Sequence, residues 1–406
     1  MAVGLNSLPS LMPVPGVRLA STAAGIKKDG QTDLALLEIA PGSEVAAVFT
    51  RNAFCAAPVI LARHHLRQGV PRYLLINSGN ANAGTGEQGL QDALHCCQAL
   101  AAAAACAAEA VLPFSTGVIG EPLPVSLIEA AASGLVAGLE EDAWVDSAQA
   151  IMTTDTVPKG ASRRFTVGGR TVTLTGIAKG SGMIRPDMAT MLAFIATDAT
   201  LAPRFLQQCL EEAMAHSFHC ITVDGDTSTN DACVLAATGR SGHAPLECVD
   251  SPEGALFRRE LTALCTELAQ SIVRDGEGAT KFITIEVSQG RHEAECRQVA
   301  YTVAHSPLVK TACFASDPNW GRILAAVGRA GVPELDLSRI TIHLGEVCIV
   351  ANGARAPGYE EAQGAAAMAG EEITIRIALG RGAVAATIWT CDLSYDYVRI
   401  NAEYRT

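Results

Sequence analysis

The sequence predicts a layered α/β fold in which sheets and helices pack face to face, with strands in pairs. The segment Phe165 to Thr175 alternates apolar and polar residues around Gly168-Gly169, which is typical of a β-hairpin. Apolar residues make up 49% of the 406 residues and aromatic residues only 5%, so the cores are expected to be built from small side chains. Strands and helices alternate without a strict strand–helix–strand repeat, which favours layers over a parallel doubly wound sheet.

The first half of the chain begins with predicted strands. Leu34 to Thr50 indicates two short strands around Pro41-Gly42, and Tyr73 to Asn77 indicates a buried strand. A loop from Ser78 to Gly86 then leads into a helix that reaches about Glu109. The remaining elements expected before the hairpin are a short strand over Val111 to Phe114 and helices over 124–137 and 142–151.

The second half follows a glycine-rich loop. Met191 to Thr197 is apolar enough for a central strand. Further strands are predicted near 220–223, 282–287, 340–350, 372–379 and 384–391, and helices near 202–216, 252–273, 319–330 and 359–369. At roughly 150 residues per domain, this length suggests two or three domains, or one domain with a large lobe.

Composition argues against several classes of function. The formal net charge is −12, and no dense run of Lys or Arg could follow a phosphate backbone, so no nucleic-acid partner is expected. Thirteen Cys without a CxxC pair favour reduced thiols and a cytoplasmic location. The most apolar stretch, Ala99 to Leu112, is short and contains Glu109, so a buried helix is expected rather than a membrane span.

Two short patterns resemble metal sites but lack essential positions. Asp224 to Asn230 begins like a calcium loop, yet its sixth position is Thr229 and its twelfth is Leu235 instead of Gly and Glu. Its Asp, Thr, Ser and Asn side chains are expected to form hydrogen bonds in a tight loop near the site. The pair His216 and His219 has no further ligands at metal-like spacing. No metal ion is therefore expected.

The segment Lys179 to Asp198, KGSGMIRPDMATMLAFIATD, is the most unusual in the chain. Pro186 stops any helix, and the loop delivers Ala189-Thr190 to the start of an apolar strand. A threonine hydroxyl becomes a useful nucleophile when its own α-amino group, with a pKa near roughly 8, acts as the base. That amine is free only if the Ala189–Thr190 bond has been cut. Spacing alone also fits a Thr190 that merely caps the strand.

The same segment resembles the cleavage-site signature of the ornithine acetyltransferase family. The resemblance extends from Gly25-Ile26-Lys27 to the C-terminus. Its other matching segments are Ser115 to Gly117, Met152 to Thr156 with Pro158-Lys159, Asp224 to Asp231, Asp275 to Lys281 and Asp317 to Arg322.

The resemblance implies an activity and a processing event. The precursor would cleave itself into an α chain, 1–189, and a β chain, 190–406, that begins with the nucleophile Thr190. Thr190 would take acetyl from N-acetylornithine, hold it as an ester and pass it to glutamate. No cofactor is implied, although some members of the family also use acetyl-CoA as a co-substrate.

The resemblance also implies an architecture. The fold would be a sandwich of sheets and helices that resembles the N-terminal-nucleophile hydrolases but differs from them in topology, with a smaller lobe toward the C-terminus. Two α and two β chains would form a heterotetramer.

The site residues follow from the matching motifs. Thr116 and Gly117 correspond to the family's oxyanion hole, which stabilises the charge that develops on the carbonyl oxygen. The implied substrate contacts are Thr154, Lys179, Thr190, Glu277, Asn401 and Thr406, the last two of which require the C-terminal tail to fold back over the site. By charge sign, Lys179 could hold a carboxylate and Glu277 an ammonium group; the alternatives are a solvated lysine and a surface acid.

Two other functions fit part of this evidence. A self-processing amidase or aminopeptidase would use the same nucleophile but resolve the acyl-enzyme with water. An unprocessed ligand-binding protein would contain a purely structural Thr190 and an intact chain.

Overall fold

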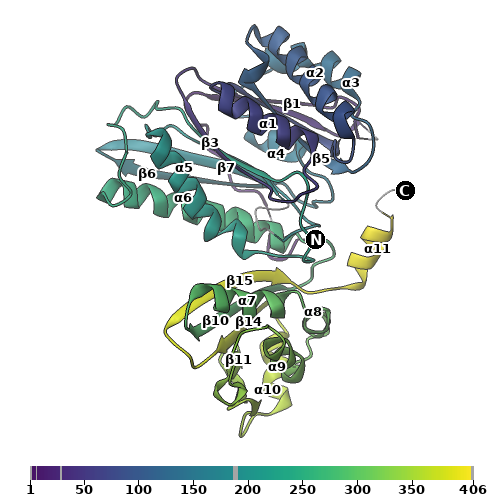
Figure 1. The fold of residues 1–406 in the computed structure, drawn as a ribbon, viewed down its shortest axis with the longest axis vertical. Helices are drawn as coiled ribbons and strands as arrows, with labels where there is room; N and C mark the ends of the chain where they lie inside the picture. Colours follow the sequence, from purple (N-terminus) through teal and green to yellow (C-terminus); the bar gives the residue numbers. More distant parts are fainter. Residues whose placement is uncertain (1, 6, 28–29, 186–190, 404–406) are drawn as a thin grey trace. The chain divides into compact units, whose positions relative to one another are not determined.

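The computed structural model describes residues 2–5, 7–27, 30–185 and 191–403, which form two compact units. The larger unit comprises Ser7–His219 and Asp226–Ile272, and the smaller comprises Met1–Asn6, Cys220–Gly225 and Val273–Thr406. Figure 1 shows the elements of each unit, coloured along the sequence.

Two sheets form the centre of the larger unit. The first has the order β1-β2-β4-β5 and consists of β1 (Val17–Thr22), β2 (Leu34–Ile39), β4 (Tyr73–Asn80) and β5 (Val111–Val118). The second has the order β3-β9-β8-β7-β6 and consists of β3 (Glu44–Phe49), β9 (Ala232–Ala237), β8 (Leu192–Thr197), β7 (Arg170–Lys179) and β6 (Lys159–Val167).

A buried apolar layer joins these two sheets. Phe114 of the first sheet meets Phe194 of the second edge to face, with 5.1 Å between the ring centroids. Both rings are buried, and β-branched and small side chains fill the space around them. The short helix α4 (Trp144–Ala150) contributes Trp144 and Ala148 to the same layer.

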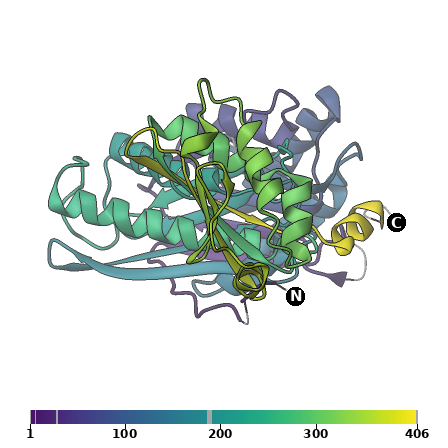
Figure 2. The same cartoon turned by 90° about the horizontal axis from the view of Figure 1, so that it is seen from below.

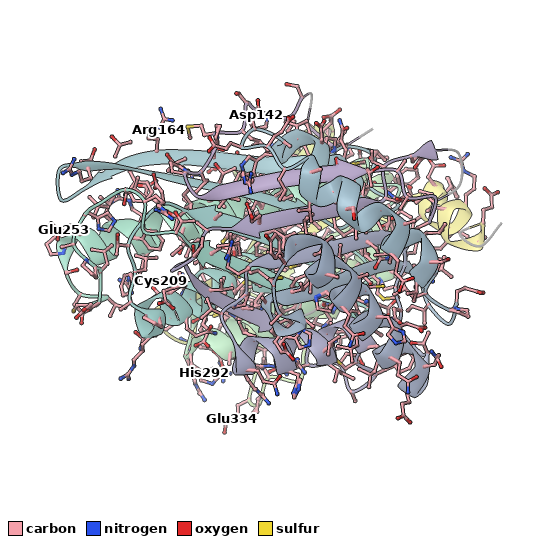
Figure 3. All side chains as sticks on the ribbon, turned by 90° about the horizontal axis from the view of Figure 1, so that it is seen from above. Asp142, Arg164, Cys209, Glu253, His292 and Glu334 are labelled. Atoms are coloured by element: carbon pink, nitrogen blue, oxygen red, sulfur yellow. The ribbon has the colours of Figure 1, made fainter. Side chains whose placement is uncertain are left out.

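Helices cover the outer faces of both sheets, which completes a four-layer sandwich (Figure 1). The first sheet is covered by α1 (Ala57–Gln68), α2 (Gly86–Ala104) and α3 (Val125–Ala137), and the second by α5 (Pro203–Ala215) and α6 (Pro252–Arg274). The predicted fold class, a layered α/β sandwich, is confirmed. Figure 3 shows the exposed side chains of Asp142, Arg164 and Glu253 pointing away from these layers.

Strand β8 lies at the centre of the second sheet, as predicted, and all six of its residues are buried. It runs antiparallel to β7, with Leu192 opposite Lys179, and parallel to β9, with Leu192 opposite Ala232. The end of β7 and the starts of β8 and β9 therefore meet at one edge of the sheet. The predicted hairpin around Gly168-Gly169 is confirmed as β6 and β7.

The smaller unit has one mixed sheet of order β13-β12-β11-β14-β10-β15. Its strands are β10 (Phe282–Gly290), β11 (Thr341–Leu344), β12 (Val347–Ala351), β13 (Ala354–Arg355), β14 (Glu372–Ala378) and β15 (Val384–Cys391). Its helices are α7 (Glu293–Ala304), α8 (Pro307–Phe314), α9 (Trp320–Gly328), α10 (Glu361–Met368) and α11 (Tyr395–Glu403). Figure 2 shows this unit's sheet and helices from a second direction.

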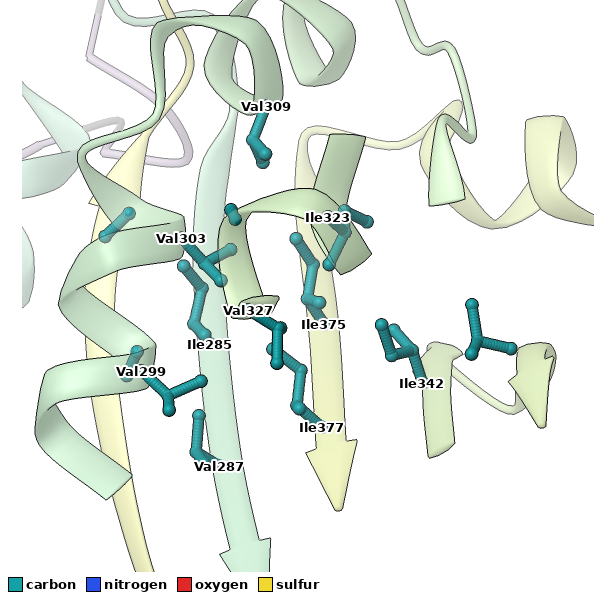
Figure 4. Close-up of a cluster of buried hydrophobic side chains, with 14 of the residues drawn as sticks. Ile285, Val287, Val299, Val303, Val309, Ile323, Val327, Ile342, Ile375 and Ile377 are labelled. Atoms are coloured by element: carbon teal, nitrogen blue, oxygen red, sulfur yellow. The ribbon is translucent and has the colours of Figure 1, made fainter. Parts of the chain in front are cut away.

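The core of the smaller unit is almost entirely aliphatic. Figure 4 shows Val299 and Val303 of α7 against Ile285 and Val287 of β10, and Val327 of α9 near Ile377 of β14. All of these side chains are completely buried. The β-branched residues suit the strands, while their valine partners on the helices fill the narrow space between the layers.

Three predicted elements differ from the structure. The helix predicted to reach Glu109 ends at Ala104, because Ala105 adopts a left-handed conformation with φ 50°. Residues 220–223 form no strand; a 3₁₀ helix at Phe218–Cys220 is followed by a single bridge between Ile221 and Trp389. The strand predicted over Val111 to Phe114 continues to Val118, because it pairs with β4 along its whole length.

Two further features concern the cysteines and the helices. All thirteen cysteines are free thiols. Among the described residues, no helix is both long enough and apolar enough to cross a bilayer.

Candidate active site

Lys179, the last residue of β7, lies at the edge of the sheet where β8 and β9 begin. Its side chain is buried, and its Nζ donates hydrogen bonds to Thr153 Oγ1 at 2.8 Å and to Thr116 Oγ1 at 3.2 Å. Asp155 Oδ2 lies 3.9 Å from the same nitrogen. Lys179 is therefore not a solvated lysine, and it joins the end of the first sheet to the end of the second.

A second buried lysine shares the carboxylate of Asp155. Lys159 Nζ donates to Asp155 Oδ1 at 2.6 Å, and the backbone N–H groups of Gly180 and Thr153 donate to the same carboxylate at 2.7 and 2.9 Å. Burial alone would raise the pKa of Asp155. The charges of Lys159 and Lys179 and the donated hydrogen bonds outweigh burial and hold this pKa well below its usual range.

We expect Asp155→Asn to lower the free energy of unfolding by about 3 kcal/mol at pH 7, because it leaves buried lysines without their anion. The folded-state pKa of Asp155 is depressed, so its contribution is fully present above the unfolded pKa of about 4 and is lost as the pH falls through the folded value. The difference between variant and wild type should thus be constant from neutral pH down to about pH 5 and shrink below about pH 4.

Urea titration at several pH values measures this difference. Glu267→Gln is a suitable control, because Glu267 pairs with Arg163 at the surface and should cost less than about 1 kcal/mol. A loss for Asp155→Asn no larger than that of the control would contradict the assigned role of the buried pair.

Thr116 and Gly117, which are predicted to form the oxyanion hole and are called the oxyanion segment below, lie near the end of β5 and are half-buried. Thr116 Oγ1 accepts its hydrogen bond from Lys179, so its own hydroxyl hydrogen can point toward another acceptor. Gly117 has φ 137° and lies opposite Gly79 in β4. A Cβ on Gly117 would come within 2.3 Å of the Gly79 carbonyl carbon, so only glycine allows the two strands to approach this closely.

The loop before β9 reaches the same edge. Asn230 Nδ2 donates to the carbonyl of Ser115, the residue before the oxyanion segment, at 2.9 Å. The carboxyl of the next residue, Asp231, accepts a hydrogen bond from the backbone N–H of Met191. The hydrogen-bonded polar loop predicted for Asp224 to Asn230 is confirmed for residues 228–230.

A second group of predicted residues meets in the smaller unit. Glu277 is buried in the loop between α6 and β10, and its Oε2 accepts a hydrogen bond from Asn401 Nδ2 at 2.7 Å. The same loop is fixed by Asp392, which accepts from the N–H groups of Thr280 and Lys281 at 2.8 and 2.9 Å. Helix α11 thus brings Asn401 to Glu277, and Glu277 is not a surface acid.

Comparison with known proteins identifies the family. The ArgJ family model matches residues 18–406. This chain belongs to the ArgJ family. The arginine biosynthesis bifunctional protein ArgJ of Pseudomonas syringae pv. tomato is 59% identical over 409 residues, covering 100% of both chains. Its counterpart in Methylococcus capsulatus is 60% identical over 396 residues, covering 98% of this chain and 97% of the relative.

A solved structure agrees with this assignment. The crystal structure of the arginine biosynthesis bifunctional protein ArgJ from Bacillus halodurans is 40% identical, covers 53% of this chain and 100% of its own, and has a TM-score of 0.51. The resemblance drawn from the sequence motifs is therefore confirmed, and with it the prediction that the chain is an enzyme.

The predicted ArgJ site residues fall into three groups. In the larger unit Thr116 and Lys179 are in contact, whereas Thr154 is half-buried and its neighbour Thr153 provides the hydroxyl that meets Lys179. In the smaller unit Glu277 and Asn401 are in contact. The predicted cleavage pair Ala189-Thr190 and the predicted contact Thr406 lie outside the described residues.

The sequence pattern predicted no role for Thr153, Asp155 or Asp231, and for Asn230 it predicted only hydrogen bonds within a polar loop near the site. All four lie in motifs that supported the resemblance, but no local pattern marks the Asp155–Lys159 ion pair, because a four-residue spacing indicates contact only within a helix and this segment is irregular. Within the described part of the chain, no group of three or more His, Cys, Asp or Glu residues could hold a metal ion.

Proposed function

We propose that this chain is a self-cleaving acetyltransferase that moves acetyl from N2-acetyl-L-ornithine to L-glutamate through an ester on Thr190. One observation carries the proposal most directly. Both ends of segment 180–191 are connected to the strand that contains the oxyanion segment. At one end Lys179 contacts Thr116. At the other end β8 pairs with β9, and Asn230, just before β9, bonds to Ser115. Membership of the ArgJ family supports the same activity.

The first half-reaction forms the acetyl-enzyme. Thr190 Oγ attacks the amide carbonyl of acetylornithine, and the α-amine of Thr190 takes the hydroxyl proton. The hydroxyl of Thr116 and the backbone N–H of Gly117 stabilise the oxygen that becomes negative. The C–N bond then breaks, the α-ammonium returns its proton to the leaving nitrogen, and ornithine departs.

The second half-reaction reverses these steps with another amine. The amino group of glutamate attacks the Thr190 ester, and N-acetylglutamate leaves as Thr190 Oγ regains a proton. Donor and acceptor therefore use one site in turn, which is a ping-pong cycle. In this scheme Lys179 supplies a positive charge for a substrate carboxylate, while Glu277 and Asn401 bind the amino-acid portion, with Thr154 and Thr406 as further contacts.

The α-amine can act as base only after cleavage between Ala189 and Thr190, giving fragments 1–189 and 190–406. The Bacillus halodurans chain supports this step, because its full length matches only 53% of the present chain. Residues 190–406 are 217 of 406 residues, which is the same share. A chain of that size is what cleavage before Thr190 would leave.

Assembly and co-substrates complete the proposal. We propose a heterotetramer of two α and two β chains in the cytoplasm that needs no cofactor. The relatives are named bifunctional, which favours a second activity in which acetyl-CoA acetylates glutamate. Incubation of the enzyme with acetyl-CoA and glutamate, without acetylornithine, tests this second activity directly.

The central test follows both products of the main reaction. Purified protein is incubated with acetylornithine and glutamate, and ornithine, acetylglutamate and free acetate are quantified together. We expect ornithine and acetylglutamate in equal amounts, and, with acetylornithine alone, acetyl on the peptide that begins with Thr190. Acetate in excess of acetylglutamate would instead indicate an amidase, and no turnover by an uncut chain would favour a binding protein.

A further inference from the structure

Asn230 and Asp231 are two consecutive buried polar residues that precede β9 of the second sheet. They lie where that sheet approaches the oxyanion segment of the first sheet. Their exposed fractions are 6% and 4%, and apolar strand β9 begins directly after them. Buried polar groups are costly unless they are hydrogen-bonded, so their partners indicate what they do.

Asn230 forms a link between the two sheets. Its Nδ2 donates to the carbonyls of Ala81 and Ser115 at 2.6 and 2.9 Å, and its Oδ1 accepts from Thr229 Oγ1 at 2.5 Å. These bonds fix the orientation of the amide. Ser115 belongs to β5 of the first sheet, whereas Asn230 leads into β9 of the second.

Asp231 holds the first residue after the predicted nucleophile. Its carboxyl accepts from the backbone N–H of Met191 and from the side chain of Ser228. The carbonyl of Met191 in turn accepts from the N–H of Ala232 at 3.1 Å. Met191 is therefore held on both of its backbone polar groups by residues 231 and 232.

The carboxyl of Asp231 is unusual in one further respect. Its Oδ2 is completely buried and has no hydrogen-bond partner among the described residues. Burial raises the pKa of Asp231 well above its ordinary value, and the hydrogen bonds and the nearby Lys179 oppose this only in part. A buried carboxyl oxygen without a partner destabilises the fold, so its presence here indicates a role other than stability.

We propose that Asn230 and Asp231 are positioning residues that hold the oxyanion segment and strand β8, which begins two residues after Thr190, in a fixed relative position. This inference rests on the proposed function, in which Thr190 is the nucleophile. Apolar packing is not directional, so the two sheets can shift against each other unless polar contacts such as Lys179–Thr116 and Asn230–Ser115 oppose the shift. A displacement of about 1 Å can reduce the rate about 10²-fold. Asn230 opposes that shift at the first sheet, and Asp231 fixes the second.

The test uses pairs of variants that keep or remove the hydrogen bonds. Asn230→Ala and Asn230→Asp both remove the two N–H donors, and Asn230→Asp keeps the size. Asp231→Ala removes the acceptor for Met191, whereas Asp231→Asn retains an amide oxygen in its place. Asp198→Ala is the matched control, because Asp198 is also buried and accepts a backbone N–H, from Thr173 at 2.7 Å, at the opposite end of β8.

For each variant, intact mass gives the fraction cleaved, and kcat and KM are expressed per cleaved chain. We expect Asn230→Ala, Asn230→Asp and Asp231→Ala to lose about 10²-fold in kcat or to stop cleaving, with KM nearly unchanged. Asp231→Asn should stay within about threefold of wild type because its hydrogen bond is conserved. Asp198→Ala should lose thermal stability but keep kcat.

Two results would overturn the proposal. The first is a kcat per cleaved chain in Asn230→Ala and Asp231→Ala that equals the wild-type value. The second is a loss of kcat in Asp198→Ala as large as in those variants, which would show that the effect comes from lower stability. Failure of the proposed function looks different, because the wild-type protein itself would then remain uncut or transfer no acetyl.

Discussion

Replacement of Thr190 by alanine is expected to leave a single chain of 42.2 kDa that transfers no acetyl. Without the hydroxyl there is no group to attack the Ala189 carbonyl, so the α-amine is never released. Both cleavage and transfer then lose their nucleophile, and turnover should fall by at least about 10³-fold, as when other covalent catalysts lose theirs. Denaturing mass spectrometry of the purified protein measures the cleavage, and ornithine release measures the turnover.

The conservative variant Thr190→Ser is the control for this experiment. Serine keeps the hydroxyl, so it should still be cut and should retain measurable transfer. If the Thr190→Ala chain were cut between residues 189 and 190, another group or a contaminating protease would have to perform the cleavage. An uncut wild-type chain that nevertheless transfers acetyl would show that the free α-amine is not the base.

Local sequence pattern predicted the parts of the fold that depend on local geometry. The hairpin around Gly168-Gly169 is confirmed because its alternation and its turn residues lie within a few positions of one another. The central strand predicted over Met191 to Thr197 is confirmed as β8, which begins one residue later at Leu192, because all six of its residues are apolar or small enough to be buried on both faces.

The contacts that sequence pattern missed are mostly between distant segments. Strand β9 pairs in parallel with β8, which places Ala232 opposite Leu192, and nothing in the local pattern of either strand specifies that register. The bonds from Asn230 to Ser115 and from Asp231 to Met191 depend on it. Thr153 rather than Thr154 reaches Lys179 because the path of an irregular loop decides which of two adjacent hydroxyls points inward.

The Gly117→Ala variant is expected to reduce acetyl transfer by about 10²- to 10³-fold, comparable to the loss of one oxyanion donor. The added methyl group would lie 2.3 Å from the Gly79 carbonyl carbon and 2.5 Å from the Asn80 nitrogen. These atoms are backbone, so β5 must move away from β4, and the N–H of Gly117 and the hydroxyl of Thr116 must move with it. The measurement is kcat per cleaved chain, with KM and melting temperature recorded on the same preparations.

Gly120→Ala separates this displacement from the cost of backbone conformation. Gly120 also has a positive φ, 86°, but a Cβ there meets no atom within 4 Å. Both variants therefore place an alanine at a positive φ, which costs at least about 1 kcal/mol, while only Gly117→Ala pushes the two strands apart. A drop in kcat confined to Gly117→Ala supports an oxyanion role for Thr116 and Gly117. Equal activity in the two variants would contradict the assignment of the oxyanion hole to β5, because strands that have separated could not keep its donors in place.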